Sequence, residues 1–83
     1  GVETNDLNFE NEFKLFPNPV KNNLKIVSKH QITYSLLYNM AGIETLFFEG
    51  NNTNIEGVPK GIYFLEINTL NNDKSVKKKV VVY

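Results

Sequence analysis

Short apolar runs, separated by Asn, Gly and Pro at nearly regular intervals, organise the chain from Phe13 onward. This spacing is typical of an all-β sandwich or barrel. Seven runs qualify as strands, and no window carries helical periodicity over three turns. The runs are FKLF, LKIVS, ITYSLLYN, IETLFFE, TNI, GIYFLEIN and KSVKKKVVV. TNI is expected to be a short edge strand.

The segments between the runs contain the residues that turns require. We predict hairpin turns at NMAG, residues 39–42, and at LNND, residues 70–73, because glycine and asparagine tolerate positive φ. FPNP, residues 16–19, sets two prolines around one asparagine. Proline biases the preceding residue toward extended geometry, so we expect a rigid corner between the first two strands. GVPKG, residues 57–61, is a second, longer corner.

The period of two along a strand predicts which side chains reach the core. Two runs have a clear inward face: Tyr63, Leu65 and Ile67 in the sixth, and Val76, Val80 and Val82 in the seventh. Lys78 shares the inward face of the seventh run. We expect it to snorkel at the edge of the sandwich.

The third run is apolar on both faces, so its period does not decide which face is buried. The competing sets are Tyr34, Leu36 and Tyr38 on one face and Ser35 and Leu37 on the other. A strand of this kind is more often central and covered on both sides than part of a ligand groove. We therefore favour a doubly covered central strand.

Residues 1–12 differ from the rest of the chain. They are acidic and rich in asparagine, and neither strand nor helix periodicity fits them. We predict an acidic linker or loosely docked arm at 1–12 and one domain at 13–83. Because the sequence begins without methionine, we also expect it to be a piece of a longer protein, in which the domain serves a partner sequence.

Composition excludes several classes of protein. Nine lysines without arginine balance nine acidic residues, whereas a nucleic-acid module would show a basic face and arginine forks. The absence of cysteine removes disulfides, thiolate zinc sites and thiol nucleophiles. No apolar run reaches the roughly 20 residues of a transmembrane helix, and nothing resembles a signal peptide.

Catalytic and metal-binding chemistry is also not predicted. The only histidine, His30, stands in a polar turn and is expected to be a solvated surface residue. The carboxylates of the strands and turns are isolated from one another in sequence: Glu44, Glu49, Glu56 and Glu66. A nucleophile, a base and an orienting group are not found together. We expect no enzyme activity, no metal and no cofactor.

Four motifs remain: FPNP, NMAG, GIYFLEI and KKKVVVY. In this order and spacing, over residues 13–83, they closely resemble the C-terminal sorting domain of the type IX, or Por, secretion system of Bacteroidetes. The matching positions are Phe16, Pro17, Asn18, Pro19, Asn39, Gly42, Gly61, Ile62, Tyr63, Lys77, Lys78, Lys79, Val80, Val81, Val82 and Tyr83. One departure is mild, since Asn39 stands where the family commonly has Asp.

The resemblance implies a seven-stranded, immunoglobulin-like antiparallel β-sandwich without catalytic activity. Such domains follow a cargo protein and direct it from the periplasm across the outer membrane through the type IX translocon. The implied partners are the translocon, its shuttle proteins, a sortase-like peptidase that usually removes the domain, and the N-terminal cargo domain. The cargo is then secreted, or displayed on the cell surface on an anionic lipopolysaccharide.

Two hypotheses connect these residues to that role. Pro17 and Pro19 would fix where the folded domain begins and leave the acidic arm extended and open to a peptidase. Residues 80–83 would form an apolar edge strand to which the translocon adds a strand, with Lys77–Lys79 orienting the encounter. The alternative, that these valines only close the sandwich, remains open.

Two other interpretations remain. One is an immunoglobulin-like stalk or carbohydrate-binding module of an extracellular protein, which would need a platform of exposed aromatic residues. The candidates are Tyr34, Tyr38, Phe47 and Phe48. Phe47 and Phe48 are adjacent, so one of them must face away from the core. The other is a homodimer formed through exposed strand edges, which is compatible with sorting.

Overall fold

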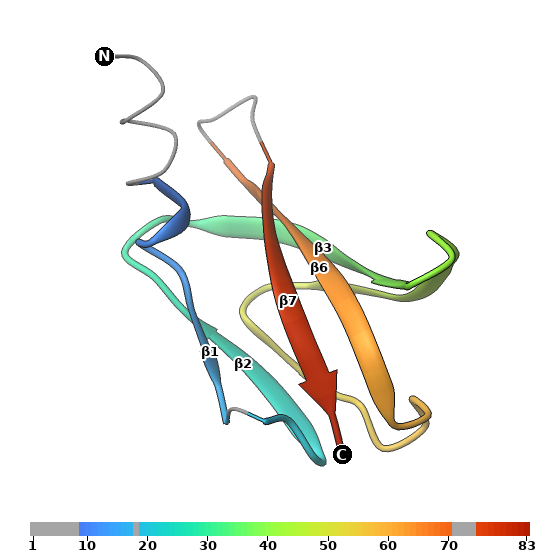
Figure 1. Cartoon of the computed structure of the whole chain (residues 1–83). Coiled ribbons are helices and arrows are strands. Elements are labelled where there is room, and N and C mark those ends of the chain that lie inside the picture. The colour runs from blue at the N-terminus through green and yellow to red at the C-terminus, as the bar shows by residue number, and fades with distance from the viewer. Residues whose placement is uncertain (1–8, 18, 71–74) are drawn as a thin grey trace.

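Two antiparallel sheets pack against each other in the computed structural model, which describes residues 9–17, 19–70 and 75–83 (Figure 1). One sheet has the order β1-β2-β5 and contains β1 (Lys14–Phe16), β2 (Asn23–Val27) and β5 (Asn52–Asn54). The other has the order β4-β3-β6-β7 and contains β3 (Ile32–Asn39), β4 (Glu44–Glu49), β6 (Gly61–Thr69) and β7 (Val76–Val82). All seven predicted strands are confirmed, with ends that agree within two residues.

The strand order is that of an immunoglobulin-type sandwich. Its first, second and fifth strands face a sheet that holds the third, sixth and seventh. β4 forms a hairpin with β3 and stays in the same sheet, as the additional strand of variable-type domains does. β5 lies at the edge of its sheet, as predicted for TNI. The expected immunoglobulin-like antiparallel sandwich is therefore confirmed.

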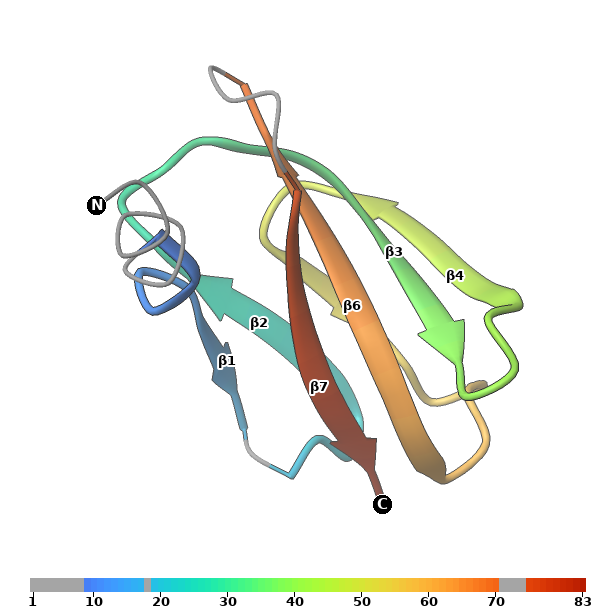
Figure 2. The ribbon, with the colours of Figure 1, turned by 45° about the horizontal axis from the view of Figure 1, so that its top comes forward.

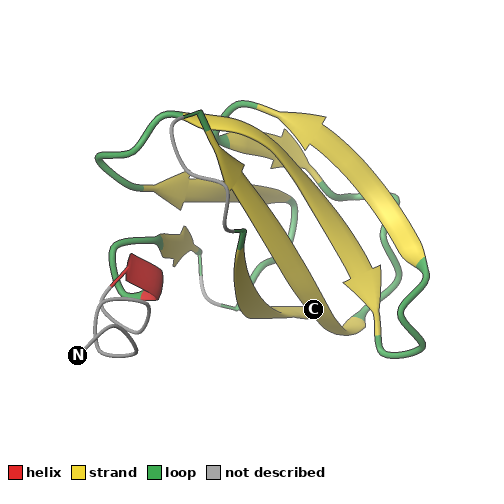
Figure 3. Cartoon of the chain, turned by 90° about the horizontal axis from the view of Figure 1, so that it is seen from above, coloured by secondary structure: helices red, strands yellow, loops and turns green. Residues whose placement is uncertain are grey.

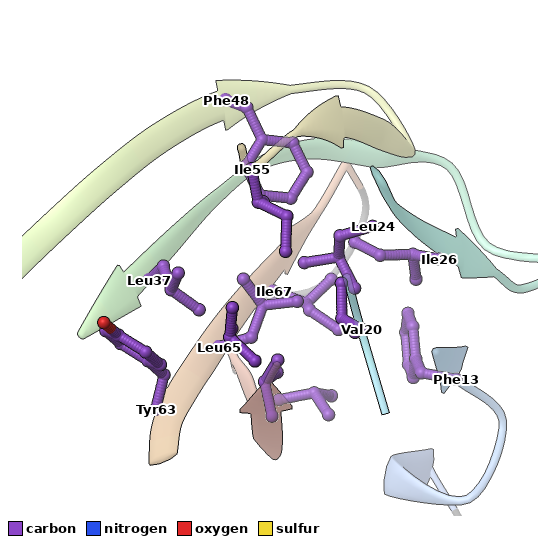
Figure 4. Packing of buried hydrophobic residues seen from close by; sticks show 13 residues of the cluster. Phe13, Val20, Leu24, Ile26, Leu37, Phe48, Ile55, Tyr63, Leu65 and Ile67 are labelled. Carbon is purple, nitrogen blue, oxygen red and sulfur yellow. The ribbon is translucent and has the colours of Figure 1, made fainter. Parts of the chain in front are cut away.

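The core lies between the sheets and contains side chains from nearly every strand (Figure 4). The predicted inward faces of the sixth and seventh runs are confirmed. Their members are all buried: Tyr63, Leu65, Ile67, Val76, Val80 and Val82. Leu24 and Ile26 meet them from β2 and Ile55 from the end of β5, and Phe48 of β4 adds to the core from their own sheet. In the undecided third run, Ser35 and Leu37 face the core.

The outer face of β3 is not covered by the described residues. β3 is central, between β4 and β6, as expected. However, Tyr34 is 38% exposed, and Leu36 and Tyr38 on the same face are only half-buried. The interpretation as a doubly covered strand is therefore wrong. The three-stranded sheet packs only against the inner face of the four-stranded sheet. Apolar residues on the outer face are therefore left uncovered by the described residues.

A helical turn precedes β1. Phe9 and Glu10 are helical, and the amides of Glu12 and Phe13 donate hydrogen bonds to the carbonyl oxygens of Phe9 and Glu10 (3.0 and 3.3 Å; Figure 3). Phe13 is fully buried, and Phe9 packs against the core. Residues 9–12 thus do not form the extended segment that we expected, because Phe9 and the following Phe13 are more stable packed against other side chains than in water.

Some predictions fall outside the described residues. These are the structure of arm residues 1–8, the corner position of Asn18, and residues 71–73 of the predicted LNND turn. The domain boundary at residue 13 stays a prediction. Within the ranges that the structure describes, no helix has the length and apolar character needed to cross a membrane.

Candidate functional site

The FPNP motif forms the corner between β1 and β2, as predicted. Pro17 and Pro19 are exposed, and the Phe16–Pro17 peptide bond is cis. Directly after the corner, Val20 is buried and crosses to the other sheet. Its amide donates to the carbonyl oxygen of Val81, and the amide of Tyr83 donates to the carbonyl oxygen of Val20, both at 2.9 Å. The corner therefore brings the chain into a short parallel pairing with the end of β7.

The NMAG motif closes the β3–β4 hairpin through the side chain of Asn39. Its Oδ1 accepts hydrogen bonds from the amides of Ala41 (2.9 Å) and Ile43 (3.0 Å). The Gly42 amide donates to the Asn39 carbonyl oxygen at 2.9 Å, and Gly42 has φ +79°. The predicted turn is confirmed. An aspartate could accept the same two bonds, so asparagine preserves the turn that the family pattern requires.

Gly61 and Tyr63 shape the corner that enters β6. Gly61 has φ +154°, a conformation that residues with a Cβ rarely adopt. The hydroxyl of the buried Tyr63 donates to the carbonyl oxygen of Pro59 at 2.5 Å. A tyrosine near the start of the sixth strand, bonded back to the preceding corner, is the tyrosine corner of immunoglobulin-like folds. Ile62 between them points outward and is exposed.

Strand register brings these separated motifs together at one end of the sandwich. Asn39 lies opposite Tyr63 in the β3–β6 pair. Gly61 lies opposite Val82 in the β6–β7 pair, and Val82 in turn bridges Val20. These five residues lie in two adjacent rows of the register, and we call them the motif end: Asn39, Tyr63, Gly61, Val82 and Val20. Figure 1 shows the last residues of β7 close to the starts of β2 and β6.

The tail after Lys77 combines buried and exposed positions. Val80 and Val82 belong to the core, whereas Lys77, Lys79 and Tyr83 are exposed. β7 is an edge strand, as the hypothesis requires. The expectation of an open edge along residues 80–83 is only partly right, because Val20 pairs with the backbone of Val81 and Tyr83.

Within the described chain, the part of the β7 edge without a neighbouring strand precedes the terminal valines, at Lys77 and Lys79. Backbone groups of alternate residues point the same way, so those of Lys77 and Lys79 point outward like those of Val81. Among the described residues, these outward groups of the two lysines have no strand partner. The free edge therefore coincides with lysines and not with the terminal valines.

A groove of about 460 Å³ runs between β1 and β7, whose outer edges face each other across it (Figure 2). Its floor is apolar and its margins are charged. The lining residues are Glu10, Phe13, Lys14, Leu15, Phe16, Val20, Lys78, Lys79 and Val80. Lys78 Nζ donates to the backbone oxygen of Glu10 at 3.3 Å, so this lysine snorkels from the inward face as predicted.

The cluster around His30 was not predicted. Its ring stacks on Phe13 (centroids 5.3 Å apart, 21° between planes) and meets the edge of Phe9 at 4.8 Å. Nε2 contacts the Glu12 carboxylate. The hydrogen bond from His30 holds the pKa of Glu12 below its usual value, with a smaller contribution from Lys29. The prediction of a solvated His30 is wrong, because its contacts with Phe13, Phe9 and Glu12 leave only 29% of the side chain exposed.

A signal for this cluster was present in the sequence. Phe9 and Phe13 are four residues apart, the spacing of neighbours on one face of a helical turn, and Glu12 lies between them. The partner, His30, lies 18 positions from Glu12. Single-sequence patterns do not pair residues across that separation.

Aromatic side chains gather on the outer face of the four-stranded sheet. Tyr34 and Phe47 stack with centroids 5.7 Å apart and 26° between planes. Phe48 is the neighbour that faces inward, so it leaves the set of platform candidates. Phe64, which was not among those candidates, is exposed on this face. Partial removal from water raises the pKa of Tyr38, with Glu66 and Glu44 adding to the effect.

No catalytic or metal-binding constellation is seen in the part of the chain that the structure describes. Within that part, no three His, Asp or Glu side chains are grouped so as to hold a metal ion. What the structure does assemble is a set of motif residues at one end of a sandwich.

Secretion system C-terminal sorting domains form the family whose model matches residues 14–83. The chain belongs to this family. The resemblance inferred from the four motifs is thereby confirmed, and the sorting domain carries a type IX secretion signal. It implies an attached cargo, interaction with the type IX machinery, and secretion across the outer membrane. No curated protein matches the chain.

Proposed function

We propose that the type IX translocon or its shuttle proteins recognise this sorting domain at the motif end. The observation that carries the proposal is the strand register. It brings NMAG, GIY, the tail and Val20, the residue after FPNP, into two adjacent rows at one end of the sandwich, although they are far apart in the sequence. If each motif served only to form its own turn or corner, the motifs would not need to lie close to one another in the fold.

Three exposed apolar side chains border the motif end and offer contacts to a partner. They are Phe16 in the FPNP corner, Ile62 in the Gly-Ile-Tyr motif and Tyr83, which is 71% exposed. The buried motif residues Tyr63, Val80 and Val82 hold the scaffold instead. We therefore assign recognition to the exposed set and shape to the buried set.

The free edge of β7 complements these anchors. The outward backbone groups of Lys77 and Lys79 are available for an added strand, and the groove between β1 and β7 would take alternate side chains of that strand. Charged lysine ammonium groups at the margin raise the rate of encounter with an acidic partner more than the affinity. We therefore propose that β-addition occurs at Lys77–Lys79, and the terminal valines are less favoured because Val20 already pairs there.

We further propose that the domain is not an enzyme and that a sortase-like peptidase separates it from a preceding cargo. Residues 9–13 pack through Phe9 and Phe13, so a cut beyond Phe9 would require this packing to open. The favoured cut therefore lies before Phe9. Mass spectrometry of the domain released by a secreting host identifies its first residue, and a cut within residues 20–83 would exclude this proposal.

Export of a fusion protein tests recognition directly. Residues 1–83 are placed behind a signal peptide and a fluorescent protein in a host with a type IX system, and medium, surface and periplasm are assayed with the translocon intact or deleted. Phe16→Ser and Tyr83→Ser are expected to leave the fusion folded but retained in the periplasm. Val27→Ser is the matched control, because Val27 is exposed on β2 away from the motif end.

Each result of this experiment has a definite meaning. Normal export of both motif-end variants excludes the motif end as the recognised surface while leaving the sorting role intact. Export that does not depend on the translocon would overturn the sorting role of this chain. Retention of Val27→Ser as well would show that substitution of any exposed apolar residue impairs export. That result would also count against recognition at the motif end.

The carbohydrate-binding alternative is less well supported. A sugar platform presents open ring faces, whereas Tyr34 and Phe47 each turn one face to the other. A glycan array with the isolated domain tests the alternative, and clear binding would favour it.

A further inference from the structure

The outer face of the four-stranded sheet has a directional charge pattern. Glu44 on β4 lies opposite Tyr38 on β3, Tyr38 lies opposite Phe64 on β6, and Phe64 lies opposite Lys79 on β7. One row across the sheet therefore begins with an acid, passes two aromatic rings and ends with a base. The two ends of this row are exposed.

The neighbouring row has two apolar residues, on β4 and β3, followed by an acid on β6 and a base on β7. Phe47 lies opposite Leu36, Leu36 opposite Glu66, and Glu66 opposite Lys77. Phe47 is 51% and Phe64 40% exposed, and both lie on a face that no described element covers. Exposed aromatic residues gathered in one patch and rimmed by charges indicate a protein interface.

We propose that a second copy of this chain covers the outer face in a face-to-face dimer with a twofold axis parallel to the strands. Such an axis places β4 of one copy over β7 of its partner. Glu44 then meets the partner subunit's Lys79, and Lys79 meets the partner subunit's Glu44. In the same row Tyr38 packs on the partner subunit's Phe64, and Phe64 packs on the partner subunit's Tyr38.

The charge pattern selects this axis among the twofold arrangements. An axis lying across the strands would place β4 over β4 and β7 over β7, so that like charges would face each other and oppose association. Both axes keep the two sheets nearly aligned, which is the usual angle for sheets packed face to face, so the charges decide between them. Because a twofold interface is isologous, each contact occurs twice.

The size of the face predicts a weak dimer. Four strands about 4.8 Å apart span roughly 20 Å, and six residues at about 3.3 Å per residue span a similar length. The area buried in total falls at or below about 1,200 Å², which is the range of transient complexes. We therefore expect a dissociation constant of roughly 100 µM to 1 mM.

Charge exchange tests the geometry. Sedimentation equilibrium of the isolated chain at low salt, up to about 1 mM, measures the dissociation constant. Lys79→Glu and Glu44→Lys are each expected to weaken the dimer by about tenfold, because each reversal creates two like-charge contacts. The double variant, which exchanges the charges, is expected to restore it. Lys25→Glu, on the exposed face of β2, is the matched control and changes little.

The outcomes separate this dimer from other arrangements. A monomer throughout the concentration range overturns the proposal. A dimer that survives both single reversals and Phe47→Ser pairs through its edges or by exchanging strands, which also overturns it. Circular dichroism verifies that each variant is folded, and the double variant supplies the rescue that a folding defect would not give. Glycan binding at Phe47 in a strictly monomeric protein would assign the face to a sugar instead.

Discussion

Asn39 shows how one side chain defines a motif. Its Oδ1 accepts two backbone amides within the β3–β4 turn, those of Ala41 and Ile43. Without it, both amides would need water or a new turn. These two hydrogen bonds need an oxygen acceptor but no charge, which explains why asparagine can replace the aspartate common in the family. The motif position is therefore structural at this residue, and recognition rests on its neighbours.

Replacing Asn39 tests that division. Asn39→Ala is expected to lower the free energy of unfolding by about 1–2 kcal/mol, because two backbone donors lose their acceptor. Asn39→Asp keeps both bonds and is expected to stay within about 0.5 kcal/mol of the original. Urea unfolding measures both values. Asn22→Ala is the control, since no hydrogen bond from that side chain is seen among the described residues, and equal losses for Ala at 22 and 39 would refute the role.

The contact between Glu12 and His30 makes the attachment of the N-terminal turn dependent on pH. The pKa of Glu12 is lowered from 4.5, chiefly by the hydrogen bond with His30. A lowered pKa in the folded state gives stability that is present above the unfolded pKa and lost as the pH falls through the folded pKa. The turn at residues 9–12 should therefore loosen in acid, below pH 4.5.

Carboxyl titration by NMR checks this prediction. In His30→Asn the pKa of Glu12 is expected to rise toward its ordinary value, and the acid loosening of the Phe9 and Phe13 ring signals should begin at a higher pH. Glu56, an exposed carboxylate bonded to Asn54 and remote from His30 in sequence, serves as the internal control. An unchanged Glu12 titration in the variant would show that His30 does not hold that carboxylate.

Strands were the elements that the sequence predicted best. Alternation in β6 and β7 predicted which face turns to the core, and the structure buries Tyr63, Leu65 and Ile67 in β6 and the inward valines of β7. β3 has apolar residues on both faces, so local pattern could not orient it. Its orientation is decided by β4 and β6, which pair with it, and by the core residue Leu37, which meets the opposite sheet.

The sequence predicted which residues belong to the candidate site, but not where they lie relative to one another in the fold. Each motif has a local meaning: a corner at Pro17 and Pro19, a turn at Gly42, a strand entry at Gly61. Their meeting depends on strand register and on the crossing of Val20 to β7. Register across sheets is a property of the whole fold, so a linear pattern does not contain it. The His30 cluster was not predicted for the same reason, because its residues come together only in the folded structure.

The end of β7 closes the sandwich, and this can be separated from recognition. Val82→Ala is expected to lower the free energy of unfolding by about 2 kcal/mol, because Val82 is buried beside Val20. Val81→Ala, on the half-buried outward side, is the matched control and is expected to cost less than about 1 kcal/mol. Chemical denaturation of both variants gives the comparison. Equal losses of unfolding free energy in the two variants would mean that burial of the Val82 side chain does not stabilise this end of β7.

At the scale of the whole molecule, the two sheets depend on one thin core. The described chain is elongated, with extents of 39 × 23 × 20 Å. Thirteen buried hydrophobic side chains fill the space between the sheets. A domain of this length has a total stability of roughly 4–12 kcal/mol, at about 0.05–0.15 kcal/mol per residue. Since neither sheet has a second core, we expect both to unfold together.

Leu65→Ala tests this cooperativity. Leu65 is fully buried on β6 and packs between the sheets (Figure 4), so truncation removes contacts and leaves a cavity that costs about 3 kcal/mol. For a domain of this size, the melting temperature should fall by roughly 12–24 °C. Leu46→Ala, at the half-buried margin of the core, is the control and should lower it much less.

Probes placed in each sheet decide whether the loss is shared. Methyl NMR signals of Leu24 in β2 and Leu37 in β3 should disappear over the same temperature range as the far-UV circular dichroism, both before and after Leu65→Ala. If the β1-β2-β5 sheet melted first while the four-stranded sheet persisted, the single-core description would fail. The pairing of Val20, which precedes β2, with Val82 of β7 at the motif end would then be lost before the rest of the domain.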